Sequence, residues 1–523
     1  MKTRQAVLQT RRLFIGLPLI LALVSPSRGQ TRVMVFADQA RDTISRFIYG
    51  HFSEHLGRCI YGGFYMGDGA MNVPTTRGIR KDVVEALKKI RIPVLRWPGG
   101  CFADTYHWKD GIGPKAERPS MTNVWWGGVT EDNSFGTHEF LDLCEQLGAE
   151  PYITGNVGSG TVQEIVQWVQ YVNSAAGIPM AALRAKNGHQ QPWNVRFWGV
   201  GNETWGCGGS MRPEHYVDVY RANATFMGSG WSNRGIFRIA SGAGSGDYHW
   251  TEVMMRDIPL SLLEGVALHH YAVIDWNNKS SATKFTTEQY GATMVQAMHM
   301  EELVSKHAAI MDKYDPKKKV ALVVDEWGGW YDTEPGTNPA FLFQQNTMRD
   351  AMIAGVTLNI FNNHCDRVRM ANLAQTVNVL QAVVLTEGDR MIVTPTYHVM
   401  EMFTPHHDAV LLPVETGSDP CVIGKDTLQS VSVSASRDAG GVITISLVNI
   451  DPLKKHNVEI HQKGTSPWRT VEGRILAGNA LQDHNTFADP DKVHPVPYTG
   501  MQLGAAGLDV VLPPFSVVVL RVR

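Results

Sequence analysis

Two glutamates in the sequence each follow a short apolar run, and each is followed by a tryptophan within two residues. Glu203 comes after Gly199 to Asn202, and Glu326 comes after Ala321 to Asp325. Hydrolysis of a glycosidic bond needs two carboxyl groups, one of which protonates the leaving oxygen while the other attacks the sugar or activates water. The pair therefore favours a glycoside hydrolase over the simpler interpretation that both glutamates only form ion pairs at the protein surface.

The neighbours of the two glutamates suggest how they divide the work. We interpret Glu203, which follows Asn202, as the general acid and base, and Glu326 as the nucleophile. A protonated carboxyl group can give a proton to the leaving oxygen while an ionised one attacks. Tyr271 comes shortly after the apolar run Val266–Leu268 and is expected to donate a hydrogen bond to Glu326, which would hold that carboxylate ionised and aimed. A separation of about 5 to 5.5 Å between the carboxyl groups would give retention of configuration.

The region that contains both glutamates alternates short apolar runs with amphipathic helices, which predicts parallel strands with crossover helices. Eight such units are what a closed (β/α)8 TIM barrel needs, and the active site of such a barrel lies at the carboxyl ends of its strands. The eight predicted strands are Phe47–Phe52, Val94–Trp97, Pro151–Thr154, Val195–Val200, Phe237–Ala240, Val266–Leu268, Val320–Val324 and Val356–Phe361.

Polar residues follow most of these predicted strands, as expected for the mouth of a barrel. They are Glu54 and His55, Arg96, Asn156, Asn202 and Glu203, His269 to Tyr271, Asp325 to Trp327, and Asn362 to His364.

Two of the connecting helices have clear sequence signals. Thr161 and Glu164 form a capping-box pattern before a stripe of apolar residues that ends at Val172. A second helix is predicted from Arg80 to Ile90, with Pro93 shortly after it. We expect both apolar stripes to pack against the barrel.

The sequence pattern changes after about residue 400, where alternating apolar residues and turns replace the helical periodicity. Strands are predicted at Leu428–Ser436, Val442–Asn449, Asn457–His461 and Leu508–Arg523, which indicates an all-β, jelly-roll-like sandwich. A strand at Val33–Ala37 is expected to cover an exposed edge of it. The predicted division is a segment 31–46 that belongs to the sandwich, a catalytic barrel 47–400 and a sandwich domain 401–523.

The first thirty residues resemble an export signal. Arg11 and Arg12 precede an apolar stretch from Leu13 to Val24, and small and polar residues follow it. The order of residues Thr10 to Phe14 also fits a twin-arginine signal, so the Sec and twin-arginine routes stay open. The pattern predicts a signal peptide over residues 1–30 and a periplasmic or extracellular protein. No other segment has about 18 uninterrupted apolar residues, so no membrane span is expected in the mature chain.

Composition narrows the range of partners. The 523 residues carry a formal charge of −2 without a cluster of basic residues, so the chain lacks the electrostatic signature of nucleic-acid or anionic-membrane binding. No motif predicts a metal or an organic cofactor. The six cysteines contain no C-x-x-C pair and allow 15 pairings, among which the sequence does not choose. We expect most of them to be free and buried, with a disulfide allowed in an oxidising compartment.

Several motifs in the chain resemble those of glycoside hydrolase family 51. Gly199 to Glu203 and Val323 to Trp327 look like the acid/base and nucleophile motifs of that family. Further similarity covers nearly the whole mature chain. It includes the segments Tyr49–Gly57, Leu95–Gly100 and Ala374–Val379.

The resemblance implies an exo-acting α-L-arabinofuranosidase with a barrel and a β-sandwich that its N-terminal segment helps to build. Such an enzyme removes terminal non-reducing α-L-arabinofuranosyl groups from arabinan, arabinoxylan or derived oligosaccharides, needs no cofactor, and is commonly a homo-oligomer. The resemblance further implies that Glu54, Asn202 and Gln375 bind the furanose hydroxyls, with Gln375 on a helix, and that Trp327 packs near the sugar.

Cys101 departs from the family pattern, because many relatives carry Asn after the Pro-Gly-Gly turn. A thiol is a poor hydrogen-bond partner, so Cys101 enters the predicted substrate-binding set as its least typical member.

Two other functions remain open on the sequence alone. One is a barrel hydrolase with the same two-glutamate mechanism but another specificity, such as a β-xylosidase or an endoglucanase, because the glutamates set the reaction and not the sugar. The other is a noncatalytic carbohydrate-binding protein. The presence of both glutamates together with Asn202 and Tyr271 argues against the second, since binding alone does not require that full set.

Overall fold

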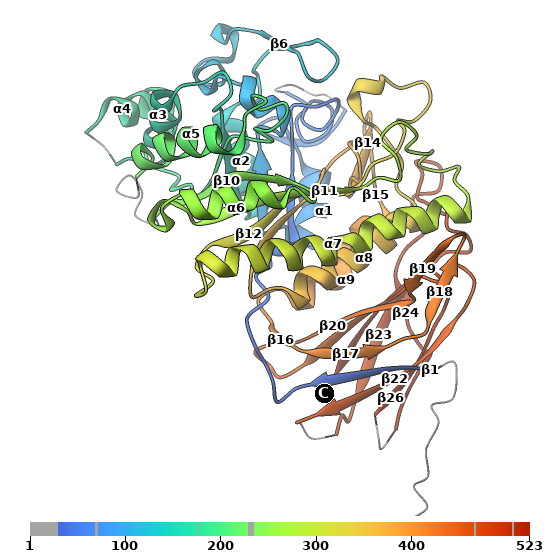
Figure 1. Cartoon of the computed structure of the whole chain (residues 1–523). Coiled ribbons are helices and arrows are strands. Elements are labelled where there is room, and N and C mark those ends of the chain that lie inside the picture. The colour runs from blue at the N-terminus through green and yellow to red at the C-terminus, as the bar shows by residue number, and fades with distance from the viewer. Residues whose placement is uncertain are drawn as a thin grey trace, which may run out of the picture.

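The structure is a computed structural model that describes residues 30–67, 69, 72–175, 177–228, 235–464, 467–504 and 507–523. Residues 1–29 of the predicted signal peptide lie outside this range. The helices among the described residues are each too short or too polar to span a lipid bilayer. The chain forms a barrel with helices around it and a separate pair of β-sheets (Figure 1).

Eight parallel strands close into a barrel, which confirms the predicted (β/α)8 fold. Each strand pairs with the next, and the ring closes where β13 pairs with β2. In chain order the strands are β2 (Gly50–Phe52), β5 (Val94–Trp97), β8 (Glu150–Gly155), β9 (Phe197–Val200), β10 (Phe237–Gly244), β11 (Gly265–Ala272), β12 (Ala321–Gly329) and β13 (Val368–Ala374).

The helices lie outside the barrel, and most of them bury apolar residues. They are α1 (Lys81–Lys89), α2 (Thr137–Leu147), α3 (Val162–Asn173), α4 (Pro179–Lys186), α5 (Pro213–Phe226), α6 (Tyr248–Asp257), α7 (Thr287–Tyr314), α8 (Met348–Asn363) and α9 (Pro395–Phe403). The two helices predicted most clearly are α1 and α3. Thr161 caps α3 by accepting a hydrogen bond from the backbone of Glu164, but the Glu164 side chain pairs with His107 instead of completing the capping box.

The eighth strand was predicted at the wrong place. Val356–Phe361 lies inside α8, and the strand that completes the barrel is β13, immediately after that helix. Nearly every residue of α8 is buried, because the helix lies between the barrel and the sandwich. The polar residues Asn362 to His364 therefore stand at the end of a helix, away from the barrel mouth, where Asn362 donates a hydrogen bond to Ser434 of the sandwich.

Two mainly antiparallel sheets enclose a second apolar core, to which both ends of the chain contribute residues. The six-stranded sheet runs in the order β16 (Val410–Leu412), β20 (Val431–Arg437), β21 (Ile443–Asn449), β27 (Ser516–Val522), β23 (Val471–Leu476) and β24 (Val496–Pro497). The five-stranded sheet runs in the order β17 (Val414–Gly417), β1 (Gln30–Phe36), β22 (His456–Lys463), β26 (Leu508–Leu512) and β25 (Met501–Leu503).

Strand β1 precedes the barrel in the sequence, whereas the other four strands of this sheet follow it. It pairs antiparallel with β17 and parallel with β22, so it lies inside the sheet and not at its edge. Its blue ribbon runs among the red strands of the C-terminal region in Figure 1. The domain boundaries at residues 47 and 401 stay predictions.

Candidate active site

The two glutamates predicted from the sequence meet at the carboxyl ends of the barrel strands. Glu326 lies on β12, and Glu203 lies in the turn that follows β9. One carboxylate oxygen of each, together with a ring nitrogen of His269, form a group in which all atoms are within 4.8 Å of one another. Glu203 has a backbone φ of 40°, a left-handed conformation that a non-glycine residue adopts at some energetic cost. The surrounding structure holds this side chain where it is.

Arg96 fixes Glu326 from below. Its guanidinium is 1% exposed and donates to Oε1 of Glu326 at 2.8 Å and to Oδ1 of Asn202 at 2.5 Å. The same guanidinium lies over the ring of Phe52 and 3.6 Å from a carboxylate oxygen of Asp325. One buried cation therefore sets the positions of a residue after β9 and of two residues on β12.

Tyr271, on β11, completes the hold on Glu326. Its hydroxyl donates to Oε2 of Glu326 at 2.8 Å, which is the contact that the sequence predicts. Burial, followed by the negative charge of Glu326, raises the pKa of Tyr271 well above its usual value, so the phenol stays protonated as a donor. Both oxygens of the Glu326 carboxylate thus receive a hydrogen bond.

His269 connects the two glutamates. Its Nδ1 is 3.0 Å from Oε1 of Glu203 and 3.6 Å from Oε2 of Glu326, while its Nε2 is 3.0 Å from Oδ1 of Asp325. Burial lowers the pKa of His269, but the charges of Glu326 and Asp325 outweigh it and raise this pKa to about 10. The imidazolium therefore donates from both nitrogens at neutral pH.

Glu54 and Gln375 form the base of the pocket. Glu54, which follows β2, is 2% exposed and accepts hydrogen bonds from the backbone of Phe102, the indole of Trp126 and the side-chain amide of Gln375. Burial and the nearby charge of Glu326 raise the pKa of Glu54 to about 7.

Gln375 comes directly after β13, so the prediction that a helix carries it is wrong. Its Oε1 is buried and has no hydrogen-bond partner among the described residues.

Asp104 organises the turn that carries Asn202 and Glu203. Its carboxylate accepts from the backbone nitrogens of Val157, Gly158 and Asn202, at 2.7 to 2.9 Å. Burial raises the pKa of Asp104 to about 7 despite these hydrogen bonds. The loops after β8 and β9 are therefore tied together beneath the pocket.

Cys101 is half of a disulfide with Cys207, which joins the turn after β5 to the turn after β9. Cys101 lines the pocket, so the structure brings it to the site, but as a disulfide and not as a thiol. The other four cysteines are free and buried, as expected for most of the six.

Trp327 is not on the wall of the pocket. Asp325 and Glu326 both face Arg96 and His269 inside the barrel, because the pairing of β12 with β13 shifts register between Val324 and Trp327. Trp327 turns outward, towards the helices. Trp327 is 1% exposed and packs edge-on against Phe361 of α8. The pocket is lined instead by Trp126 and Trp330, and the second of these packs edge-on against Tyr271.

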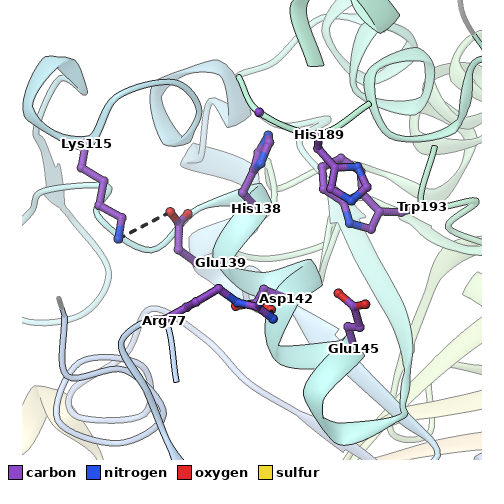
Figure 2. Close-up of a pocket in the computed structure, with 9 residues that line it drawn as sticks. Arg77, Lys115, His138, Glu139, Asp142, Glu145, His189 and Trp193 are labelled. Atoms are coloured by element: carbon purple, nitrogen blue, oxygen red, sulfur yellow. Dashed lines mark hydrogen bonds and ion pairs between the residues drawn. The ribbon is translucent and has the colours of Figure 1, made fainter. Parts of the chain in front are cut away.

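A larger cavity of about 380 Å³ lies elsewhere, between α2 and the turn after α4. Two of its three carboxylates are beside cations: Asp142 is paired with Arg77, and Glu139 lies 3.9 Å from Lys115 (Figure 2). Ion pairs of this kind compensate the charges locally and do not place two carboxylates around one bond. The geometry that glycoside hydrolysis requires is therefore at the barrel mouth.

Comparison with known proteins agrees with this site. Residues 86–259 match the profile of an alpha-L-arabinofuranosidase 1 domain, and residues 325–516 match an alpha-L-arabinofuranosidase C-terminal domain. An intracellular exo-alpha-L-arabinofuranosidase from Bacteroides ovatus is 47% identical over 98% of this chain and 99% of its own. The chain belongs to the α-L-arabinofuranosidases of glycoside hydrolase family 51. It is a glycoside hydrolase.

Solved structures of the family have the same fold. The GH51 arabinofuranosidase from Xanthomonas axonopodis pv. citri superimposes with a TM-score of 0.93 at 46% identity, over 95% of this chain and 100% of that one. An α-L-arabinofuranosidase from Thermotoga maritima, solved as an arabinose complex, gives a TM-score of 0.80 at 30% identity, over 94% and 99% of the two chains.

The predicted export of the protein is contradicted by the same comparison. The Bacteroides ovatus relative, which matches this chain over almost its whole length, is named an intracellular enzyme. The basic residues and the apolar stretch near the N-terminus therefore led to a wrong prediction of export.

Part of the site was not predicted from the sequence. Arg96 and His269 were noted at strand ends without a role, and Asp104, Trp126 and Trp330 were not singled out. An arginine or a histidine inside an otherwise apolar strand is a usable signal, because a buried charge requires a partner. No comparable signal marks the two tryptophans, which lie in loops far apart in the sequence.

Proposed function

We propose that this chain is a retaining, exo-acting α-L-arabinofuranosidase in which Glu326 is the nucleophile and Glu203 the general acid and base. One observation carries the proposal: a carboxylate oxygen of Glu203 and one of Glu326 lie within 4.8 Å of each other. Retaining glycosidases have their carboxyl groups about 5 to 5.5 Å apart, whereas inverting ones need about 6.5 to 9.5 Å to admit a water molecule. The spacing supports the retaining mechanism.

In the first step, Glu326 attacks the anomeric carbon and Glu203 gives its proton to the departing oxygen. An ester bond to Glu326 forms as the glycosidic bond breaks, and the alcohol leaves neutral. Arg96 and Tyr271 each donate to one oxygen of Glu326, so the attacking carboxylate is already in place. Positioning of this kind lowers the entropic part of the barrier.

In the second step, Glu203 takes a proton from a water molecule that attacks the same carbon. The ester to Glu326 breaks, arabinose leaves, and Glu203 is protonated again. His269 donates to Oε1 of Glu203, which keeps this carboxyl group directed at the reacting centre through both steps.

The base of the pocket supports recognition of a terminal sugar. Glu54, Asn202 and Gln375 offer polar atoms close to Glu326, and Oε1 of Gln375 is a buried acceptor that a sugar hydroxyl would satisfy. Buried side chains close the pocket behind these groups, which suits the end of a chain more than its middle. The proposed substrates are arabinan, arabinoxylan or the arabinose-containing oligosaccharides derived from them.

The test is hydrolysis of nitrophenyl α-L-arabinofuranoside, with the β-D-xylopyranoside and β-D-glucopyranoside as controls. We expect preferential release from the arabinofuranoside, and an NMR spectrum taken early in the reaction should show the α-anomer of arabinose first. Initial formation of the β-anomer would refute the retaining mechanism. Preferential release from another glycoside would leave the two-glutamate mechanism and change the specificity. Assembly as a homo-oligomer, implied by the family resemblance, stays a prediction that light scattering tests.

A further inference from the structure

The disulfide between Cys101 and Cys207 lies directly beside the proposed general acid. The Sγ atom of Cys207 is 3.7 Å from Oε2 of Glu203, and Cys101 faces the pocket from the opposite turn. The two sulfur atoms and a Glu203 oxygen all lie within 4.8 Å of one another. Two sulfurs and a carboxylate at this spacing are a set of donors that a thiophilic metal ion prefers.

This pair differs from every other cysteine in its accessibility. Cys101 and Cys207 are partly exposed, whereas the four free cysteines are buried. Burial also raises the pKa of the buried thiols, to about 12 for Cys59 and about 11 for Cys421, so they are poor nucleophiles and poor metal ligands. A reductant or a metal ion in solution therefore reaches sulfur at the active site and at no other described cysteine.

We propose that reduction of the Cys101–Cys207 disulfide converts the edge of the active site into an inhibitory zinc site formed by Cys101, Cys207 and Glu203. The inhibitory part rests on the proposed role of Glu203 as general acid and base. In the oxidised protein the two sulfurs are bonded to each other and offer no thiolate, so the site does not form.

The redox step needs a two-electron reductant, for which a soluble dithiol or a phosphine serves. A phosphine attacks one sulfur, the S–S bond breaks, and hydrolysis transfers a water oxygen to phosphorus and two protons to the sulfurs. The disulfide is reduced to two thiols as the phosphine is oxidised to its oxide. Zinc then displaces one proton from each thiol and the proton that Glu203 holds as the acid, and it binds the two thiolates and the Glu203 carboxylate.

The local geometry allows this coordination. Tetrahedral zinc bonds thiolates at about 2.3 Å and carboxylates at about 2.0 to 2.2 Å, which places two sulfurs about 3.8 Å apart. The Cα atoms of Cys101 and Cys207 are 5.4 Å apart, so rotation of the two side chains reaches that separation without moving the turns. A carboxylate bound to zinc cannot carry a proton to the leaving oxygen, and general acid–base catalysis is worth about 100- to 10,000-fold in rate.

The experiment compares oxidised protein with protein that has been reduced by a phosphine and then freed of it without oxygen. In the reduced protein, a thiol reagent should find two accessible thiols in the native state, and zinc should bind at one ion per chain. Its rate on an alkyl α-L-arabinofuranoside, whose leaving group needs the proton from Glu203, should then fall at least about 100-fold and return when a chelator removes the zinc. The oxidised protein should bind no zinc and keep its rate. Reduced protein that binds no zinc, or that keeps its rate with zinc bound, would overturn the proposal.

Two variants locate the effect, each judged by the ratio of its own rates with zinc and with chelator. Cys207→Ser should bring this ratio close to one after reduction, because one thiolate is lost. Cys365→Ser changes a buried cysteine far from the pocket and should leave the full inhibition. The reverse pattern would refute the assigned ligands. Zinc stoichiometry is measured without substrate, so it tests the zinc site independently of activity. A protein that hydrolysed no arabinofuranoside would refute the proposed function alone.

Discussion

The two ends of the barrel are built from opposite kinds of residue. At the amino ends of the strands the interior is apolar: Phe197 packs edge-on against Phe47 at 5.0 Å and against Phe237 at 5.6 Å, beside Val323 and Met370. At the carboxyl ends of the same strands the interior is charged, with Arg96 and His269 among carboxylates.

The amino ends of the strands form the lower end of the barrel, which stabilises the fold. The carboxyl ends form its upper end, which reduces the stability of the fold. Apolar packing at the lower end stabilises the fold through burial of apolar surface and van der Waals contact, and it needs no charged or hydrogen-bonding partner. The upper end buries charges that each need a partner, a costly arrangement that is kept for chemistry. Changes at the lower end should therefore reduce folding, and changes at the upper end should reduce activity.

The largest expected effect is on activity at the upper end. Glu326→Ala should lower kcat by more than about 10,000-fold on every arabinofuranoside, because the ester cannot form. Glu203→Ala should lower kcat/KM by about 100- to 10,000-fold on substrates with alkyl leaving groups and far less on nitrophenyl substrates, which leave without a proton. Steady-state kinetics on both substrate types measure the contrast.

Thermal unfolding of both variants is the control, and both should be fully folded at the temperature of the assay. Equal losses of Glu203→Ala on good and poor leaving groups would contradict its assignment as the acid.

The next effect is on stability at the lower end. Phe197 is 2% exposed, so Phe197→Ala should lower the free energy of unfolding by about 3 to 5 kcal/mol through lost burial and a cavity. Urea unfolding followed by circular dichroism measures this change. The rate per folded molecule should stay within about twofold of the wild type. A tenfold loss of kcat/KM in fully folded protein would show that the two ends are not separable.

The smallest expected effect is a pH-dependent stability at the upper end. Glu54 has a pKa of about 7 in the folded protein, above its usual 4.5, so its protonated form stabilises the fold below pH 4.5 and this stabilisation is lost as the pH rises to 7. Glu54→Gln stays neutral and should gain up to about 3 kcal/mol relative to the wild type between pH 4.5 and pH 7.

Melting temperatures of the wild type and Glu54→Gln at several pH values test this difference. A gap that is constant with pH would mean that Glu54 titrates normally.

Much of this architecture could be predicted from the sequence, and the errors have physical causes. Seven barrel strands were found because their apolar runs are short and bounded by polar turns. Val356–Phe361 failed because α8 is buried on all sides and lacks the polar face that distinguishes a helix from a buried strand. The true last strand contains Arg369 and Asn372, which hid it.

The candidate site divides in the same way. Glu203, Glu326 and Tyr271 could be found because each closes an apolar run, and a strand end in a barrel points to the site. The disulfide partner of Cys101 could not be found, since pairing depends on two turns that meet only in the folded chain. Trp327 was misplaced because the register of β12 shifts beside Glu326, and the sequence does not show which neighbour of Glu326 then turns outward.

The place of β1 between β17 and β22 has a consequence for how the protein is made. On the ribosome, the segment that forms β1 emerges before the barrel, yet both of its sheet neighbours are translated only after the whole barrel. Until then β1 has unpaired backbone groups along both sides, a state that invites pairing with other chains. The barrel can close early in synthesis, whereas the sandwich must wait for its last strands. Chains released after β13 but before β17 is translated would contain all eight barrel strands and leave β1 without either of its sheet neighbours.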